Sequence, residues 1–453
     1  MRRIWTHLKK ENDVASNVSL TGLATALAER ANSGKPIRIG LIGCGEMGTD
    51  IVTRTWMMDG IEVAAIANLR SDKARKAVEL ATGETEGSQF VTSTDRLNAA
   101  IETGKTALVE DANTLLESGL IDVVVEATGL PGIGAEYGLK AMREGKHLVM
   151  MNVEADTTVG AYLKRQADKL NVVYTLGAGD EPSACMELIE FAAAMGHKIV
   201  CAGKGKNNPL KHDAVPHEYE EEACRRNMNP RMLTEFVDGS KTMVEMAAIA
   251  NATGLVPDIP GMHGPAAGPK ELASRLVPTK DGGVLSDIGR VDYSVGKGVA
   301  PGVFVIVESE HPRILERMRD LKMGDGPYFC FTRPYHLTSL EVPLTCAKAV
   351  LYGTADMVPL DSPIAEVCAL AKKDLAAGEQ LGEIGEYDYR AWTMEAGDAR
   401  GASAIPVGLL SKAVVTQAIP KGSLITYDNT RPVENSTIVR IRKLQDEMLS
   451  GDT

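Results

Sequence analysis

The stretch that decides the fold is "IRIGLIGCGEMGTDIV", residues 37–52. It reads as a short buried strand, a turn with Gly43, Gly45 and Gly48, and the start of a helix. In such a context a G-x-G-x-x-G spacing permits a tight turn, a close approach of a pyrophosphate to the backbone, and close packing of helix on strand. The N–H groups of the first helical turn then attract the phosphates. The stretch predicts a dinucleotide-binding domain.

Apolar runs and helical segments alternate from residue 37 onward, with short links between them. Continuous apolar runs of this kind are typical of a parallel sheet that helices cover on both faces. We therefore expect an α/β fold with a doubly wound parallel sheet of the Rossmann type over residues 37–203. The runs expected to form its strands include IRIGLI, IEVAAIA, IDVVVEA, HLVMMN, VVYTL and HKIVCA.

Three further parts flank this domain. Residues 1–36 form an extension with an amphipathic helix in SLTGLATALAER, for which Ser19 is a candidate N-cap. Over residues 204–350 the alternation gives way to long Gly- and Pro-rich loops, one clear helix and two later strands, which predicts an α+β domain for substrate binding and dimerisation. Residues 351–453 predict a small β-rich module of the β-clip kind that ends in a charged helix.

Composition excludes several classes of protein. The 453 residues carry a formal charge of −12, which argues against non-specific binding to nucleic acid or to an anionic membrane surface. No apolar run reaches the ~18 residues of a membrane span, and the N-terminus lacks the apolar core of a secretory signal. The seven cysteines are widely spaced, which favours reduced thiols and a cytoplasmic location.

The end of the second expected strand indicates the cofactor. Folds that prefer NAD place Asp or Glu there to bind the ribose 2′-hydroxyl, whereas this chain has Asn68, Arg70, Ser71 and Lys73. An arginine can make charge-assisted bonds to a 2′-phosphate, so we expect NADPH rather than NADH. The alternative is that Arg70 and Lys73 only solvate the start of a helix.

Later strands end in residues that also suit the nicotinamide half of a dinucleotide. IDVVVEATG and HLVMMNVEA end at the carboxyl edge of the sheet, where open α/β sheets bind ligands. Glu154 could belong to this edge or to a solvated helix start. The predicted cofactor-binding residues are Gly43, Gly45, Glu46, Met47, Gly48, Asn68, Arg70, Ser71, Lys73, Ala127, Thr128, Gly129 and Asn152.

A carbonyl reductase also needs groups that hold the substrate and supply a proton. CAGKGKNNP offers two lysines and two amides directly after an expected strand, with a solvated basic loop as the alternative. DGSKTMVEMAAIAN predicts a helix capped at Asp238, with Lys241 and Glu245 on one face, where an exposed salt bridge is the alternative. The predicted catalytic residues are Lys204, Lys206, Asn207, Asp238, Lys241 and Glu245.

Anion and metal ligands are less sharply indicated. Arg333 and His336 in FTRPYHLTSLE suit a phosphate, together with Asn208, although a structural arginine in a turn fits equally. His263 lies on a loop that could close over a substrate. Asp180 and Glu181 in GAGDEPSA are candidates for holding a divalent ion, or for capping the following helix.

These residues carry a resemblance. The glycine motif, DVVVEATG, GLKAMREGKHLVMMN and GAGDEPSACMELI, within residues 37–200, resemble the homoserine-dehydrogenase-like oxidoreductases. Those enzymes follow the equivalent of Asn152 with a lysine, whereas this chain has Val153. DLAAGEQLGE and AIPKGSLIT, within residues 352–435, are similar to the SAF (antifreeze-like) domain.

The combination resembles the 1-deoxy-D-xylulose 5-phosphate reductoisomerase-like enzymes, which make 2-C-methyl-D-erythritol 4-phosphate for the isoprenoid precursor pathway. This resemblance implies NADPH, a divalent cation (Mg²⁺ or Mn²⁺), a homodimer and a small phosphorylated sugar as substrate. Two alternatives remain open: a homoserine-dehydrogenase-like oxidoreductase acting on an amino-acid-like alcohol, and a non-enzymatic NADP(H)-sensing regulator.

Overall fold

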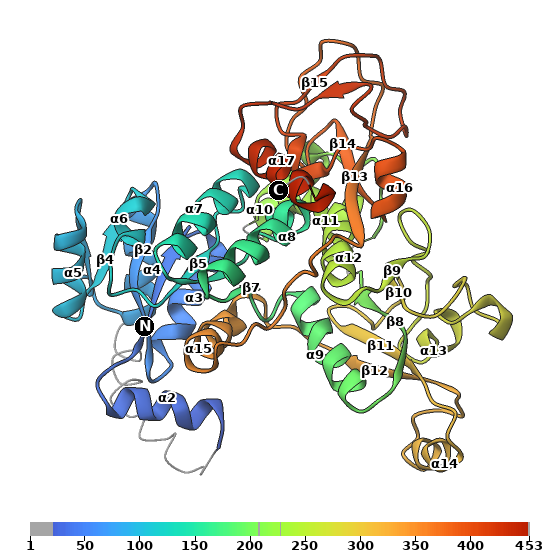
Figure 1. Ribbon diagram of the computed structural model, residues 1–453, viewed down its shortest axis with the longest axis horizontal. Helices are drawn as coiled ribbons and strands as arrows, with labels where there is room; N and C mark the ends of the chain where they lie inside the picture. The colour runs from blue at the N-terminus through green and yellow to red at the C-terminus, as the bar shows by residue number, and fades with distance from the viewer. Residues whose placement is uncertain (1–20, 207–208, 227, 452–453) are drawn as a thin grey trace. The chain divides into compact units, whose positions relative to one another are not determined.

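The strand expected at the start of the deciding stretch is the central strand of a seven-stranded sheet. A computed structural model describes residues 21–206, 209–226 and 228–451. The sheet has the order β3-β4-β2-β1-β5-β6-β7, and every neighbouring pair is parallel. This arrangement confirms the predicted α/β class with a Rossmann-type sheet (Figure 1).

The chain divides into two compact units. The first contains the seven-stranded sheet and comprises the described part of Met1–Asn152, with Leu163–Gly179 and Leu337–Val358. Its elements are α2 (Leu23–Asn32), β1 (Ile37–Ile42), α3 (Glu46–Trp56), β2 (Ile61–Ala67), α4 (Ser71–Thr82), β3 (Ser88–Phe90), α5 (Thr94–Glu102), β4 (Thr106–Val109), α6 (Ala112–Leu116), β5 (Val123–Glu126), α7 (Pro131–Arg143), β6 (His147–Met150), β7 (Tyr174–Leu176) and α15 (Val342–Tyr352).

Local sequence explains these elements. In α4 the buried residues Ala74, Ala77, Val78 and Ala81 recur at helical spacing, and Gly83 ends the helix in the left-handed conformation. The N-terminal amphipathic helix is confirmed as α2, which begins after Gly22, while the candidate cap Ser19 lies outside the described residues. No helix among the described residues combines the length and apolar character needed to span a membrane.

The second unit is built on a mixed five-stranded sheet, order β12-β11-β8-β10-β9. It comprises Val153–Tyr162, Asp180–His336 and the described part of Pro359–Thr453, so α8 contributes residues to both units. The elements are α8 (Val153–Leu170), α9 (Glu181–Ala194), β8 (Lys198–Gly205), α10 (Glu220–Arg225), α11 (Pro230–Asp238), α12 (Ser240–Thr253), β9 (Val256–Pro257), α13 (Leu272–Arg275), β10 (Arg290–Ser294), β11 (Val303–Glu308), α14 (Pro312–Asp320), β12 (Tyr328–Arg333), β13 (Ala365–Ala371), β14 (Tyr389–Glu395), α16 (Ala396–Gly401), β15 (Val414–Val415), β16 (Thr430–Arg431) and α17 (Thr437–Ser450).

Two assignments differ from the sequence-based expectation. The prediction that the run HKIVCA ends the first sheet is wrong, because this run lies in β8, which pairs with β10 and β11. Residues 337–350 lie in the first unit, where Figure 1 shows α15 beside the blue elements. An apolar run indicates a strand but not which strand it pairs with, which is why HKIVCA was assigned to the wrong sheet.

Candidate functional site

The glycine turn has the geometry that a pyrophosphate needs. Gly43 has a φ of 95°, and a Cβ there would lie 2.5 Å from the Ala127 carbonyl oxygen. A Cβ on Gly48 would lie 2.5 Å from the Gly43 carbonyl oxygen, so this residue allows α3 to pack on the turn. A Cβ on Gly45, the N-cap of α3, would have no atom within 4 Å. The backbone at Gly45 is therefore open to a ligand.

The loop after β2 is held by Asn68. Its side-chain oxygen accepts a hydrogen bond from Cys44 N–H at 3.0 Å, and its amide donates to the Arg70 carbonyl at 2.7 Å. Arg70 is exposed at the N-cap of α4, and Ser71 Oγ lies 3.3 Å from Glu110 Oε1. Asn68 thus connects the glycine turn to the segment that we expect to recognise the ribose.

A buried carboxylate organises the next loop of the same sheet edge. Glu126 has no exposed surface, and its Oε1 accepts hydrogen bonds from Thr128 N–H, at 2.9 Å, and from the Thr128 hydroxyl. Gly129 follows with a φ of 69°. Asn152 is buried at the end of β6. The structure therefore gathers the predicted cofactor residues at the carboxyl ends of β1, β2, β5 and β6.

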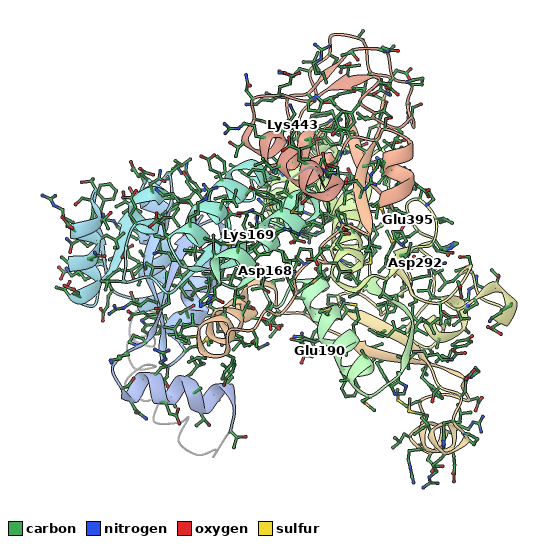
Figure 2. All side chains as sticks on the ribbon, in the orientation of Figure 1. Asp168, Lys169, Glu190, Asp292, Glu395 and Lys443 are labelled. Atoms are coloured by element: carbon green, nitrogen blue, oxygen red, sulfur yellow. The ribbon has the colours of Figure 1, made fainter. Side chains whose placement is uncertain are left out.

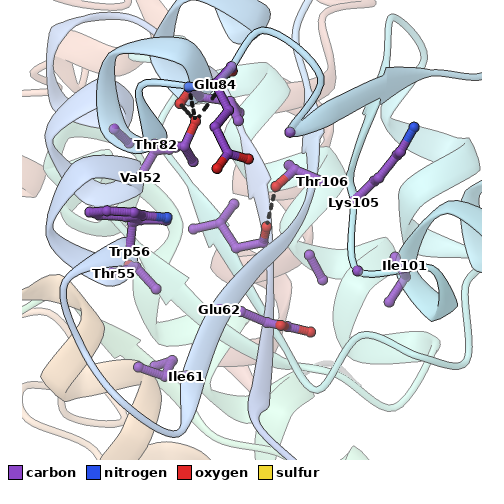
Figure 3. Close-up of a pocket in the computed structure, with 16 residues that line it drawn as sticks. Val52, Thr55, Trp56, Ile61, Glu62, Thr82, Glu84, Ile101, Lys105 and Thr106 are labelled. Carbon is purple, nitrogen blue, oxygen red and sulfur yellow. Dashed lines mark hydrogen bonds between the residues drawn. The ribbon is translucent and has the colours of Figure 1, made fainter. Parts of the chain in front are cut away.

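A separate hollow of about 470 Å³ opens at the opposite edge of this sheet (Figure 3). Its lining includes Trp56, at the end of α3, and Ile61 and Thr106, which begin β2 and β4. Dinucleotides bind at the carboxyl ends of such strands. This hollow is therefore not the dinucleotide site.

In the second unit, three of the residues predicted to be catalytic, Lys204, Lys241 and Glu245, join three further acids in a lysine–carboxylate cluster. Lys204 lies within β8 and is buried, whereas we expected it in an open loop after the strand. Its ammonium lies 2.6 Å from Glu181 Oε1 and also pairs with Glu245 Oε2. The cluster, as named here, comprises Glu154, Asp180, Glu181, Lys204, Lys241 and Glu245.

Glu181 and Glu245 share the ammonium of Lys204, and the pKa values of the two acids shift in opposite directions. Burial alone would lower the pKa of Lys204, but the charges of Glu181 and Glu245 raise it. The pKa of Glu181 falls, because the opposing effect of burial is outweighed by Lys204 and His336. Burial and the charge of Glu181 raise the pKa of Glu245 to about 8. Oε1 of Glu245 is buried and has no hydrogen-bond partner among the described residues.

Lys241 faces inward rather than forming the exposed salt bridge considered as an alternative. Its ammonium lies 3.6 Å from Glu154 Oε1 and 4.0 Å from Asp180 Oδ2, with its side chain 19% exposed. Its pKa is raised, since these carboxylates outweigh the effect of burial. Glu235 on α11, which the sequence analysis did not select, adds a further buried acid whose pKa burial raises to about 8.

Lys206 differs from the other two lysines. It is buried, and its ammonium donates a hydrogen bond to the Phe236 carbonyl oxygen at 2.6 Å. Burial, reinforced by the charge of Lys204, lowers the pKa of Lys206 to about 8. A lysine with such a pKa can exchange a proton near neutral pH. Asn207 and Asn208, predicted beside it, lie outside the described residues.

Asp238 is fully buried between α11 and α12. The N-cap of α12 is Gly239, whereas Asp238 is the last residue of α11, and its Oδ1 accepts a hydrogen bond from Ser240 N–H at 2.8 Å. Its Oδ2 lies 2.6 Å from the ammonium of Lys372, which the sequence analysis did not select. These contacts indicate that Asp238 supports the start of α12, the helix that carries Lys241 and Glu245 of the cluster.

The two predicted phosphate ligands that the structure describes, Arg333 and His336, pair with different carboxylates. Arg333 Nη1 lies 2.8 Å from Glu187 Oε2, and its guanidinium stacks over the Tyr335 ring at 4.9 Å. His336 Nε2 lies 3.5 Å from Glu181 Oε1 instead. This arrangement favours the structural role for Arg333 that the sequence left open.

Asp180, Glu181 and His336 each offer a donor atom, and these atoms lie within 4.8 Å of one another. Two carboxylates and one imidazole suit a divalent ion such as Mn²⁺. These residues would hold such an ion. Both acids are predicted metal ligands, whereas His336 is predicted from the sequence to bind the substrate phosphate.

The His263 loop is anchored by hydrogen bonds. Asp292, labelled in Figure 2, accepts hydrogen bonds from the N–H groups of His263, at 3.0 Å, and Gly264, at 2.9 Å. His263 Nε2 lies 2.7 Å from Asp258 Oδ2. Its closure over a substrate stays a prediction.

Comparisons with known proteins agree with both units. Residues 43–176 match the family described as homoserine dehydrogenase, NAD binding domain, and residues 179–342 match the family described as oxidoreductase DRL, catalytic domain. Homoserine dehydrogenase from Neisseria gonorrhoeae (strain ATCC 700825 / FA 1090) is 28% identical over 149 residues. That likeness covers 31% of this chain and 28% of the relative, so the chain spans less than a third of the relative's length.

Solved structures give weaker likenesses. A probable dehydrogenase from Thermotoga maritima superposes with a TM-score of 0.41 and 16% identity, covering 70% of this chain and 90% of that one. The 3-ketoreductase KijD10 from Actinomadura kijaniata gives a TM-score of 0.34 and 16% identity, covering 71% and 91%. The two family matches liken the first part of the chain to the NAD binding domain of homoserine dehydrogenase and the part that follows to an oxidoreductase catalytic domain.

Proposed function

We propose that the protein is an NAD(P)-dependent oxidoreductase that interconverts a hydroxyl and a carbonyl group, with Lys206 as the proton-transferring group. The first unit supplies the hydride through the nicotinamide, and the second supplies the proton and the charges that bind the substrate. The observation that carries the proposal is the buried ammonium of Lys206, held by a hydrogen bond to the Phe236 carbonyl oxygen. Burial and the nearby charge of Lys204 lower its pKa, which suits proton transfer.

For the substrate, we propose an amino-acid-like alcohol such as homoserine. The homoserine dehydrogenase match supports this choice. The cluster also holds four carboxylates against two lysines, and the buried Glu245 Oε1 lacks a partner among the described residues. A buried carboxyl oxygen in that state is costly, and a substrate hydroxyl, which can both donate and accept a hydrogen bond, would satisfy it.

The reductoisomerase reaction on 1-deoxy-D-xylulose 5-phosphate is the second candidate. It is favoured by the absence of the family lysine at Val153 and by the Asp180–Glu181–His336 donor set. A divalent ion held there would polarise the substrate's carbonyl and hydroxyl oxygens. Against it, Arg333 is already paired with Glu187.

One paired assay separates the candidates. NADP⁺ and NAD⁺ reduction is followed with homoserine, and NADPH oxidation with 1-deoxy-D-xylulose 5-phosphate and Mg²⁺ or Mn²⁺. We expect turnover with homoserine, lost in Lys206→Met. Turnover only with the phosphorylated sugar would select the second candidate, and tight NADPH binding without turnover of either would favour the NADP(H)-sensing regulator. The SAF-like character of residues 351–453 stays a prediction. The homodimer is also a prediction, and light scattering can test it.

A further inference from the structure

Asp238 lies where two elements of the candidate site meet. It ends α11, whose Phe236 carbonyl accepts the Lys206 hydrogen bond. Its side chain also accepts a hydrogen bond from the N–H of Ser240, the first residue of α12, which carries Lys241 and Glu245. Its side chain has no exposed surface. A buried carboxylate needs a cationic partner or several hydrogen bonds to remain charged. The partner of Asp238 therefore matters to the whole cluster.

That partner comes from the C-terminal part of the chain. Lys372 directly follows β13, and its side chain is 2% exposed. Besides Asp238, its ammonium donates hydrogen bonds to the carbonyl oxygens of Ala214 and Glu386, both at 2.9 Å. Two hydrogen bonds to carbonyl oxygens and one ion pair with Asp238 thus hold the buried ammonium of Lys372.

The antiparallel strands β13 and β14 and the residues beside them also form hydrogen bonds with α12 along its length. Ser240 Oγ accepts a hydrogen bond from Ala391 N–H at 2.9 Å, and Thr393 Oγ1 donates to the Met243 carbonyl at 2.7 Å. Near the other end of the helix, Asn251 Oδ1 accepts from Ala365 N–H at 2.9 Å. Figure 1 shows β13 and β14 beside α12.

We propose that Lys372 is a positioning residue of the candidate site: through its ion pair with Asp238 it fixes the end of α11 and the start of α12, and with them Lys206 and the cluster. The inference rests on the proposed function in so far as Lys206 transfers the proton. It gives the C-terminal part of the chain a role in the chemistry without any contact with substrate.

The proposal has a measurable electrostatic consequence. Asp238 favours the charged form of Lys206, whereas burial and Lys204 disfavour it. Burial raises the pKa of Asp238, and Lys372 opposes that rise. Without Lys372 the buried carboxyl takes up a proton, so Lys206 loses an attraction and its pKa falls. The titratable and charged groups that interact with Lys206 or Asp238 include Lys204, Glu235, Glu245, His212, Lys372 and Arg390.

The test is competitive acetylation of the full chain with acetic anhydride over a range of pH, read by mass spectrometry at Lys206. We expect the Lys206 pKa to fall by about half a unit or more in Lys372→Met. Lys373→Met is the matched control, since that neighbour pairs with Glu379 and Asp388 with its side chain 47% exposed. A Lys206 pKa that shifts no more in Lys372→Met than in Lys373→Met overturns the proposal.

Folding of each variant is checked by thermal unfolding and by nicotinamide binding. If Lys372→Met does not fold, the double variant Lys372→Met with Asp238→Asn takes its place, because it leaves no unpaired buried charge. The same fall in the Lys206 pKa is expected in the double variant. An unchanged Lys206 pKa would contradict the proposal. Labelling needs no substrate. Absence of turnover therefore counts against the proposed function. An unchanged pKa of Lys206 counts against the positioning role of Lys372.

Discussion

The ammonium of Lys206 donates a 2.6 Å hydrogen bond to the carbonyl oxygen of Phe236, in the last turn of α11. The partial negative charge at the end of a helix favours a cation. Burial, with the charge of Lys204, nevertheless lowers the pKa of Lys206 to about 8. Lys206 is thus fixed by a hydrogen bond to a neutral acceptor, and its lowered pKa allows it to gain or lose a proton near neutral pH.

The first prediction concerns pH. A reduction needs protonated Lys206, so kcat/KM for the carbonyl should fall as pH rises through about 8, and kcat/KM for alcohol oxidation should rise through the same value. Lys206→Met should lower kcat/KM by about 10²–10⁴-fold and abolish this inflection. Lys211→Met, an exposed lysine paired with Glu218, is the control. An inflection near pH 8 that persists in Lys206→Met would exclude the assignment.

The second prediction concerns cofactor choice. Arg70 is exposed at the N-cap of α4, where a 2′-phosphate would lie. Arg70→Ala should raise the KM for NADPH by about tenfold or more and leave that for NADH nearly unchanged, because only the former loses a charge-assisted bond. Arg75→Ala, exposed on the same helix, should change neither value. Equal effects on both cofactors would mean that Arg70 does not read the phosphate.

The third prediction concerns the metal. Mn²⁺ titrated into the protein, followed by the electron paramagnetic resonance signal of the free ion, should show one site per chain. His336→Ala and Asp180→Asn should each weaken binding by at least ~10-fold, since each removes a donor. His217→Ala, an exposed histidine, serves as the control. Unchanged affinity in both donor variants would place any ion elsewhere.

The fourth prediction concerns stability. Burial raises the pKa of Glu235 to about 8, above the 4.5 of a free glutamate. Its contribution to the folded state is complete below pH ~4.5 and is lost as pH rises through about 8. Glu235→Gln should therefore gain stability relative to the parent as pH rises from 5 to 9. A gain on the order of 1 kcal/mol would raise Tm by about 2–4 °C at pH 9.

Glu222→Gln, in an exposed pair with Arg226, should show no such pH-dependent gain in thermal unfolding. If the Tm difference between Glu235→Gln and the parent is the same at pH 5 and pH 9, Glu235 is ionised throughout and the raised pKa is incorrect.

Sequence patterns predicted the first sheet well because strand, turn and helix signals coincide there. Gly43 and Gly48 are needed for backbone reasons that spacing alone reveals. β3 and β4 were missed, since Ser88–Phe90 and Thr106–Val109 are too short to stand out as apolar runs. Strand partners are set by tertiary contacts, which is why β8 was misplaced.

The candidate site was predicted by residue type more than by arrangement. Lys204, Lys241 and Glu245 do meet, but their partner acids come from α8 and α9, and spacing in the chain carries no signal for such pairing. Lys372 looked like one of many charged residues in AKKDLAAGEQ. Only its burial distinguishes it from its neighbour Lys373.

The measurement that tests the central claim most directly is a calorimetric titration of NADPH into the parent protein and into Gly45→Ala. A Cβ at Gly45 would have no atom within 4 Å, so the variant should fold with an unchanged Tm. Its methyl group would then occupy the place of the pyrophosphate. We expect one NADPH per chain in the parent and a loss of affinity of at least ~100-fold in the variant. A parent protein that binds no nicotinamide dinucleotide, or a variant that binds it equally well, would contradict the account.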